Sequence, residues 1–385
     1  MKIVYFTTAQ EEKDYRNFIN IWKITLNASN QNFHNKFIRA LAINNEVEVI
    51  SVRPFSLSKT KVTKLDKETK KDGNITWHYL KRSGGRIMRS LSIVPQVKKV
   101  LSSLDLSNAI FLTDTINSSV VRSVVTVNKK YKRPIIGICT DSPSNISGTK
   151  RSYTLYLLDQ AKKYSGYIAL TESLNYLFNP DQKPSYIFEG IVEDRTFPKS
   201  TLDQKNPYFF FGGAMMERYG LYQLIAAFKI LNPKNIDLYI CGHHMDSVAY
   251  KEATKGMNNI KYLGLLPANK VMEYESKALA CINPRPFTED LDRFSIPSKT
   301  LEYMSMGRPT ISVKNTILKK KFPKEIVWLD TANESDIVHG LKAVLKMSEE
   351  QREEFGAKAK AKVLESYSLE SVAKNIQGFL TEFVK

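Results

Sequence analysis

The chain has 385 residues, of which 42% are hydrophobic, and a formal net charge of +18 at pH 7. It is long enough for two domains with separate cores, and no apolar run approaches the roughly 20 residues that a membrane-spanning helix requires. The start, MKIVYF, turns polar too soon for a secretory signal, so we expect a cytoplasmic protein. The three cysteines lie far apart in apolar runs, so we expect reduced thiols and neither disulfides nor a zinc site.

The first half of the chain alternates short apolar runs with amphipathic stretches, a pattern typical of α/β architecture with parallel sheets. Amphipathic helices are expected at 32–45 and 154–164. Strands are expected at 2–6, 47–52, 109–113, 134–140, 166–171 and 185–190.

Two basic stretches lie between these strands. We expect 59–71 to be a solvated loop. The stretch 81–99, KRSGGRIMRSLSIVPQVKK, mixes basic with apolar side chains, so it either lies on an anionic membrane surface or forms an ordinary surface helix. The positive charge would also attract nucleic acid, but the basic residues are dispersed and no nucleic-acid-reading motif accompanies them.

A polar, turn-rich segment at 196–207 separates the two halves, so we place one domain at 1–200, a second at 207–368 and a last helix at 369–384. Both halves predict doubly wound, Rossmann-like domains that face each other across a cleft, with ligands at the carboxyl ends of the strands. In the second half we expect strands at 208–213, 236–242, 260–264, 280–284 and 309–313, and helices at 219–231, 269–278 and 298–306.

Two strand ends of the second half carry groups suited to phosphate. Gly212 and Gly213 end the strand YFFFGG, where paired glycines either let a ligand approach the backbone or form a plain tight turn. Arg285 follows the strand ACINP and either binds a diphosphate through paired hydrogen bonds or projects into solvent. Neither the dinucleotide nor the Walker glycine pattern is present.

The stretch FSIPSKTLEYMSMGRPTI predicts a short helix that begins at Pro297 and Ser298 and ends at a glycine. Its first N–H groups, with Ser298, Lys299 and Thr300, form a candidate anion site, and Glu302 lies one turn further on. A carboxylate beside an anion site needs donors of its own, such as sugar hydroxyls, so the combination indicates a nucleotide. The alternative is a surface ion pair between Lys299 and Glu302 on a capped helix.

The segment 282–311, INPRPFTEDLDRFSIPSKTLEYMSMGRPTI, resembles the donor-site segment of retaining GT-B glycosyltransferases, the large family numbered four, in the subgroup with N-x-R-P and then P-S-K-x-x-E-Y-M. Other segments within 207–380 follow in the same order, whereas the resemblance of the first half is looser. The resemblance implies a GT-B fold and transfer of a sugar from a UDP- or GDP-sugar with retention of anomeric configuration. It also implies that no metal or other cofactor is needed, and that 369–384 packs back on the first domain.

The same resemblance assigns roles to residues of the second domain. Glu302 would bind the ribose hydroxyls of the donor, while Lys299 and Arg285 would neutralise its diphosphate and so stabilise the leaving group electrostatically. Gly213 and its neighbours would pass close to the phosphates. Leu265 and Leu266 would frame the base through backbone contacts.

The sequence departs from the family pattern in the loop before the P-S-K motif. The family's wider motif has a glutamate where this chain has Phe294, and Asp290 and Asp292 are candidates to replace its contact to the sugar. The alternative for these aspartates is a solvated loop, and no metal site is expected there. Many relatives carry an arginine just after the glycine pair, and here Arg218 either supplies the missing charge or lies on the surface.

The acceptor side of the first domain lacks the family's glycine-rich loop. Asn32 and His34, near the start of the first helix, are candidates to reach the acceptor, although a lone histidine is more often structural. Asp141, after the strand at 134–140, either orients the acceptor or caps a turn. With the basic stretch, these features predict a peripheral membrane enzyme on the inner face of the membrane, with a polysaccharide, glycolipid or lipid-linked acceptor.

Two other functions compete with this prediction. Phe294 in place of the expected glutamate would suit a GT-B protein that has lost catalysis and serves as the subunit of an active transferase. The net charge alone would suit a nucleic-acid-binding protein. The retained Lys299 and Glu302 favour the enzyme over a silent subunit, and donor binding would separate these two. Filter binding with a salt titration would test the nucleic-acid alternative.

Overall fold

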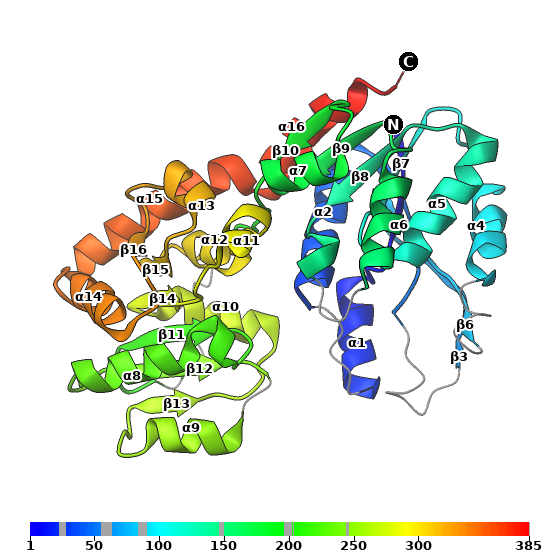
Figure 1. The fold of residues 1–385 in the computed structure, drawn as a ribbon. Helices are drawn as coiled ribbons and strands as arrows, with labels where there is room; N and C mark the ends of the chain where they lie inside the picture. The colour runs from blue at the N-terminus through cyan, green and yellow to red at the C-terminus, as the bar shows by residue number, and fades with distance from the viewer. Residues whose placement is uncertain are drawn as a thin grey trace. The chain divides into compact units, whose positions relative to one another are not determined.

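The chain folds into two compact units, each built around one sheet (Figure 1). The first unit comprises Met1–Ile191 and Leu369–Lys385, and the second comprises Val192–Ser368. The expected linker at 196–207 falls within the second unit, and part of it lies outside the described residues. The computed structural model describes residues 1–22, 28–54, 64–83, 91–145, 150–195, 202, 204–243 and 246–384.

The sheet of the first unit has eight strands in the order β10-β9-β8-β7-β1-β2-β5-β4. All neighbours are parallel except β4, which pairs antiparallel with β5 at the edge. β4 begins at Glu68 within the stretch expected to be a solvated loop, and its charged, largely exposed side chains suit an edge strand because they discourage further pairing. The strands are β1 (Lys2–Thr7), β2 (Glu46–Ser51), β4 (Glu68–Asp72), β5 (Ile75–Tyr79), β7 (Ala109–Asp114), β8 (Ile135–Cys139), β9 (Gly166–Ala169) and β10 (Ser185–Ile187), and β3 (Lys64–Leu65) pairs separately with β6 (Arg82–Ser83).

Helices cover both faces of this sheet, and the last helix of the chain belongs among them. Asn45, at the end of α2, donates a 2.7 Å hydrogen bond to Gln377 of α16. Phe37 of α2 and Ile376 of α16 lie in one buried cluster with the central strands, so α16 completes the core of the first unit. The helices are α1 (Glu12–Trp22), α2 (Ala28–Asn44), α4 (Ile93–Leu101), α5 (Ser118–Tyr131), α6 (Arg151–Ala161), α7 (Glu172–Phe178) and α16 (Leu369–Thr381).

The second unit has six parallel strands in the order β13-β12-β11-β14-β15-β16. Counted within the unit this is 3-2-1-4-5-6, the Rossmann order, in which the chain reverses its direction of winding between β11 and β14. The strands are β11 (Tyr208–Gly212), β12 (Asp237–Cys241), β13 (Ile260–Tyr262), β14 (Ala280–Asn283), β15 (Thr310–Val313) and β16 (Val327–Leu329). The helices are α8 (Leu221–Leu231), α9 (Ser247–Thr254), α10 (Ala268–Lys277), α11 (Glu289–Phe294), α12 (Ser298–Ser305), α13 (Thr316–Lys321), α14 (Glu334–Leu345) and α15 (Glu349–Tyr367).

The aromatic strand β11 shows why this sheet is buried on both faces. Phe209 and Phe211 pack into the cluster formed with α8 and α14, whereas Tyr208 and Phe210 pack into a second cluster on the opposite face, with Tyr303 of α12. Such a two-sided strand reads as a continuous apolar run, which is typical of parallel sheets. The predicted fold class, two Rossmann-like α/β domains with parallel sheets, is confirmed.

Close backbone packing fixes the carboxyl ends of three neighbouring strands in this unit. Gly242, after β12, has φ +151°, and a Cβ atom built on it would lie 1.6 Å from the carbonyl oxygen of Gly213. The N–H of Gly213 donates a hydrogen bond to the carbonyl oxygen of Cys241, and the N–H of Gly242 donates one to the carbonyl oxygen of Gly264, which follows β13. The loops after β11, β12 and β13 are therefore joined at a point where only glycine fits.

Replacing Gly242 by alanine should destabilise the second unit, because the added methyl group overlaps backbone that cannot move independently. We expect a loss of about 3 kcal/mol in the free energy of unfolding, measured by chemical denaturation. Gly264→Ala is the matched control, since Gly264 also has a positive φ of +76° but open space around it. The control should lose only about 1 kcal/mol, and equal losses in the two variants would contradict the packing argument.

Candidate functional site

The loops that follow β11 and β14 meet where the strand order reverses. Gly220 has φ +77°, and a Cβ atom built on it would lie 2.1 Å from the carbonyl oxygen of Pro284. The guanidinium carbons of Arg218 and Arg285 each lie 5.2 Å from the centre of the Tyr219 ring. The structure thus gathers two of the predicted cations around one aromatic ring, with Arg218 exposed and Arg285 half-buried.

Tyr303 of α12 ties the end of β11 to the helix that carries the predicted anion site. Its hydroxyl accepts a 3.0 Å hydrogen bond from the N–H of Gly212 and donates a 3.1 Å bond to the carbonyl oxygen of the same residue. Burial raises the pKa of this hydroxyl well above its usual value, so it remains a neutral donor. The ammonium of Lys299 lies 5.6 Å from the centre of the Tyr303 ring, so the same tyrosine contacts both this cation and the glycine end of β11.

Lys299 lies between two carboxylates. Its Nζ is 3.1 Å from Oε1 of Glu302 and 3.2 Å from Oε1 of Glu275, on α10. The side chains of Lys299 and Glu302 are 34% and 24% exposed, whereas that of Glu275 is fully buried. Burial by itself would lower the pKa of the Lys299 ammonium, but the two carboxylates outweigh it and hold this pKa well above its usual value. The predicted pairing of Lys299 with Glu302 is therefore part of a partly buried network that includes Glu275, and not an isolated surface pair.

Sequence reasoning missed Glu275. The expected helix at 269–278 contained it, but its neighbour Glu273 is equally acidic and nothing in the local sequence distinguishes the two. Glu273 pairs with Lys270 within the same helix at 2.8 Å, whereas Glu275 pairs with a residue of another helix. Only the packing of α10 against β11 and α12 makes this difference.

The first turn of α12 differs from the expected anion site in two respects. The helix begins at Ser298 with Pro297 in the capping position, so Ser298 is not the cap, and no side chain caps the helix. The N–H groups of Ser298 and Thr300 already donate to the carbonyl oxygens of Ile296 and Pro297.

Thr300 is not presented to a ligand. Its side chain is fully buried, and its hydroxyl accepts a 2.9 Å hydrogen bond from Asn283 and lies 3.1 Å from the hydroxyl of Ser312. Because β14 and β15 pass beneath this face of α12, the threonine points into the sheet. Thr300 therefore links the helix to the strands, and its assignment as a donor-binding side chain is corrected.

The EDLD segment forms the short helix α11 and not a solvated loop. Oδ1 of Asp292 accepts hydrogen bonds from the Asn315 side chain at 2.9 Å and from the N–H of Thr316 at 2.8 Å, which anchors α11 to the start of α13. Asp290 is exposed and Phe294 is half-buried. Within the described parts of the chain, no group of three or more His, Cys, Asp or Glu side chains is placed to hold a metal ion.

The predicted base-framing leucines follow β13. Leu265 is 65% exposed, and Leu266 packs against the aromatic cluster around Tyr208. Their loop is fixed from within the sheet, because Leu263 donates to the carbonyl oxygen of Ile240. The backbone of this loop lies at the carboxyl edge of the sheet, where a base-binding role stays a prediction.

The residues predicted to reach the acceptor lie in the first unit and differ in how exposed they are. Asn32 is exposed on α2, but His34 is fully buried: its Nδ1 lies 2.5 Å from the hydroxyl of Tyr5, and its Nε2 lies 3.8 Å from Oδ2 of Asp114. Burial lowers the pKa of His34 to about 3 and raises that of Asp114 to about 6. His34 is therefore a neutral core residue, and its assignment to the acceptor is corrected. Asp141 is half-buried after β8 and accepts a 2.8 Å hydrogen bond from the N–H of the next residue.

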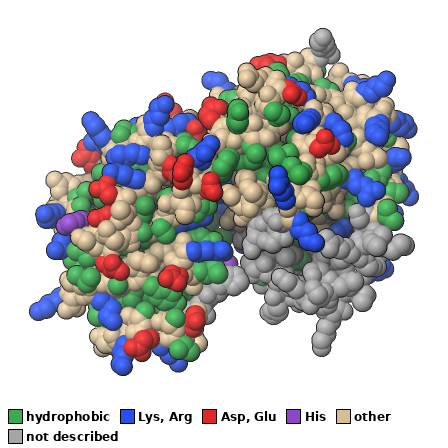
Figure 2. Space-filling view, viewed as in Figure 1, with side chains coloured by type: hydrophobic (Ala, Val, Ile, Leu, Met, Phe, Trp, Pro, Cys, Tyr) green, Lys and Arg blue, Asp and Glu red, His purple; other side chains and the backbone are tan. Residues whose placement is uncertain are grey.

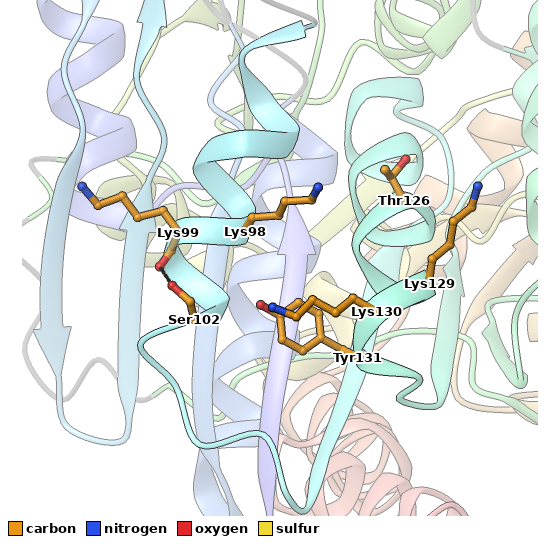
Figure 3. Close-up of a pocket in the computed structure, with 7 residues that line it drawn as sticks. All are labelled: Lys98, Lys99, Ser102, Thr126, Lys129, Lys130 and Tyr131. Atoms are coloured by element: carbon orange, nitrogen blue, oxygen red, sulfur yellow. Dashed lines mark hydrogen bonds between the residues drawn. The ribbon is translucent and has the colours of Figure 1, made fainter.

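The basic stretch at 81–99 is described only in part, because 84–90 lie outside the described residues. Its end forms α4, and the last turns of α4 and α5 border a cavity of about 700 Å³ (Figure 3). Elsewhere on the described face, Lys and Arg side chains are scattered among acidic ones (Figure 2). The residues that line the cavity are Lys98, Lys99, Ser102, Thr126, Lys129, Lys130 and Tyr131.

Removing the Lys299 ammonium should destabilise the protein, because it takes away the cation that lies 3.2 Å from the buried carboxylate of Glu275. For Lys299→Met we expect a loss of about 3 kcal/mol in the free energy of unfolding, measured by chemical denaturation. The double variant Glu275→Leu/Lys299→Met should regain most of this loss, since the buried charge is gone. Lys358→Met, which breaks an exposed pair with Glu354, should cost no more than about 0.5 kcal/mol. A double variant as unstable as Lys299→Met would contradict the argument.

Comparisons with known proteins agree with the fold described above. The solved structures that resemble the whole chain include sucrose-phosphate synthase from Thermosynechococcus elongatus, with 11% identity, 99% of this chain and 98% of that chain covered, and a TM-score of 0.69. E. coli trehalose-6-phosphate synthase bound with UDP-2-fluoro glucose has 12% identity, full coverage of both chains and a TM-score of 0.69. The Anabaena protein Alr3699/HepE in complex with UDP-glucose has 11% identity, 99% and 100% coverage and a TM-score of 0.67.

At these identities the structures establish the fold alone, and a comparison of the sequence with curated proteins gives no match. A family match covers the second unit: residues 192–362 match the family described as Glycosyl transferases group 1. This region contains both arginines around Tyr219 and the network around Lys299. The chain therefore has the GT-B fold, and its residues 192–362 are similar to the family described as Glycosyl transferases group 1.

Proposed function

We propose that the protein transfers a sugar from a nucleotide-sugar donor, a UDP- or GDP-sugar, which binds at the carboxyl edge of the second unit's sheet. The observation that carries the proposal is the ammonium of Lys299, which lies between Glu275 and Glu302 and against the ring of Tyr303, whose hydroxyl is bonded to Gly212. A cation and a partly exposed carboxylate at the strand reversal suit a ligand that carries both phosphates and ribose hydroxyls. The complexes of Alr3699/HepE with UDP and with UDP-glucose support this choice of ligand by analogy.

The chemistry proposed for this site is electrostatic. As the bond between the sugar and the diphosphate breaks, negative charge grows on the leaving phosphate, and Lys299 and Arg285 would stabilise it. Both cations are pre-positioned, one by two carboxylates and the other by the Tyr219 ring, so little reorganisation is needed. We propose that no metal is needed, because these two cations neutralise the leaving diphosphate. We also propose retention: the acceptor hydroxyl forms the new bond to the sugar as the bond to the diphosphate breaks, and its proton passes to the leaving phosphate. Asp141 in the first unit is the proposed residue for orienting the acceptor.

We further propose a lipid-linked, glycolipid or polysaccharide acceptor and a cytoplasmic protein that binds the membrane peripherally. None of the helices within the described residues is long and apolar enough to cross a membrane. The lysines around the cavity between α4 and α5 support attraction to an anionic surface (Figure 3). Because both helices run antiparallel to the sheet strands, these lysines lie at the edge opposite the strands' carboxyl ends.

A catalytically silent GT-B subunit is the second candidate, and one observation favours it. Phe294 stands where a glutamate is expected, and Asp292, a candidate replacement, is occupied with Asn315 and Thr316. Asp290 is exposed and remains the candidate for this contact. A protein that binds none of the nucleotides and serves as the subunit of an active glycosyltransferase would match this second function.

Calorimetric titration with UDP, GDP, ADP and CMP tests the donor site. We expect one nucleoside diphosphate to bind selectively, and Glu302→Ala to weaken it at least about tenfold, because the carboxylate no longer binds the ribose hydroxyls. Glu354→Ala, an exposed glutamate of α15, is the control and should bind as the wild type does. Lack of binding to all four nucleotides would refute the proposed enzyme.

Vesicle flotation tests the membrane proposal. Vesicles of phosphatidylglycerol and phosphatidylcholine should bind the wild type at low salt and release it at high salt, because the attraction is electrostatic. Replacing Lys98, Lys129 and Lys130 by glutamine should weaken binding at least about tenfold, at about 1 kcal/mol for each lysine. The control replaces three exposed lysines of the second unit, Lys251, Lys255 and Lys358. Equal effects of the two triple variants, or no binding at low salt, would refute this surface.

A further inference from the structure

Glu275 is a fully buried carboxylate in the second unit and one of the two groups that hold the Lys299 ammonium. Its partner Lys299 lies 24 residues further along the chain, on a different helix. A buried carboxylate is costly unless a cation and hydrogen bonds compensate it. Glu273, two residues earlier, satisfies this need with Lys270 in its own helix, so the longer-range pairing of Glu275 is a specific feature of the tertiary structure.

Glu302 and Glu275 hold Lys299 from different environments. Glu302 is on the same helix as Lys299, three residues away and partly exposed, so a donor can reach it. Glu275 is inaccessible, so no ligand can compete for it. When Glu302 turns to the donor's hydroxyls, its hold on Lys299 weakens, and Glu275 is the counter-ion that stays in place.

We propose that Glu275 is a positioning residue that keeps the Lys299 ammonium charged and aimed at the donor diphosphate while Glu302 binds the donor's hydroxyls. The inference rests on the proposed function for the identity of the ligand. The effect of Glu275 on the charge of Lys299 depends only on these two side chains. Glu275 acts through Lys299 and touches neither the donor nor the transferred sugar.

The pH dependence of nucleotide binding follows from this pairing. Carboxylates hold the pKa of Lys299 well above its usual value against the effect of burial. Glu275→Gln keeps the shape and a hydrogen-bond acceptor but removes one of the two charges, so burial lowers the pKa of Lys299. The ammonium is then lost as the pH rises, and the affinity for a diphosphate falls with it.

The experiment titrates UDP and GDP into Glu275→Gln, the wild type and the control Glu273→Gln at pH 7 and pH 9. We expect the affinity of Glu275→Gln to fall at least about twofold more than that of the wild type between these pH values, because one carboxylate instead of two then holds up the pKa of Lys299. The affinity of Glu273→Gln should change with pH as that of the wild type does. The wild-type titrations also correct for ionisation of the nucleotide itself. A pH-independent loss, or no difference from the wild type, would overturn the proposal, because a merely structural role predicts one of these.

A second measurement reads the same pairing without any ligand. Nuclear magnetic resonance of ¹³C-labelled lysine, with Lys299→Arg to assign the signal, should show Lys299 titrating at lower pH in Glu275→Gln than in the wild type. If the wild type binds no nucleotide, the proposed function fails, while a lowered titration still supports the pairing. An unchanged titration overturns the inference whether or not nucleotides bind.

Discussion

The ion pairs of one lysine determine how the candidate site is held together. Lys299 joins α12 to α10 through the buried carboxylate of Glu275, and Tyr303, on the next turn of the same helix, joins α12 to the end of β11. The cation, the glycine end of the strand and the partly exposed Glu302 are thereby fixed relative to one another. Because a buried carboxylate without its cation is strongly destabilising, stability and the charge of the site depend on the same pair.

The strand order explains why these groups lie together. The winding reverses between β11 and β14, so the helices that follow the two strands lie on opposite sides and leave the carboxyl edge open. Glycines that tolerate no side chain then bring the loops into contact, Gly220 against Pro284 and Gly242 against Gly213. Arg285 reaches the Tyr219 ring because of this contact, and the candidate site acquires its second cation.

The strand reversal of the first unit has different surroundings. Its strand order reverses between β1 and β7, and the side chains of Tyr5, His34 and Asp114 fill the space there, all of them buried. Burial keeps the histidine neutral and raises the pKa of Asp114 to about 6, and all three side chains are part of the core. The two Rossmann-like units thus share a type of topology but differ at the strand reversal. Cations lie at the reversal of the second unit, whereas packed polar side chains fill that of the first.

The sequence by itself determined the α/β class, the buried strands and the short helix that carries Lys299 and Glu302, because apolar periodicity and helix-terminating glycine and proline are local signals. Tertiary structure decided which polar side chains are available. Thr300 and His34 point into the core, Asp292 is bonded to α13, and Glu275 lies beneath Lys299, because neighbouring strands and helices from distant parts of the chain pack against them. Residue type and spacing do not specify such long-range neighbours, and only the packed fold does.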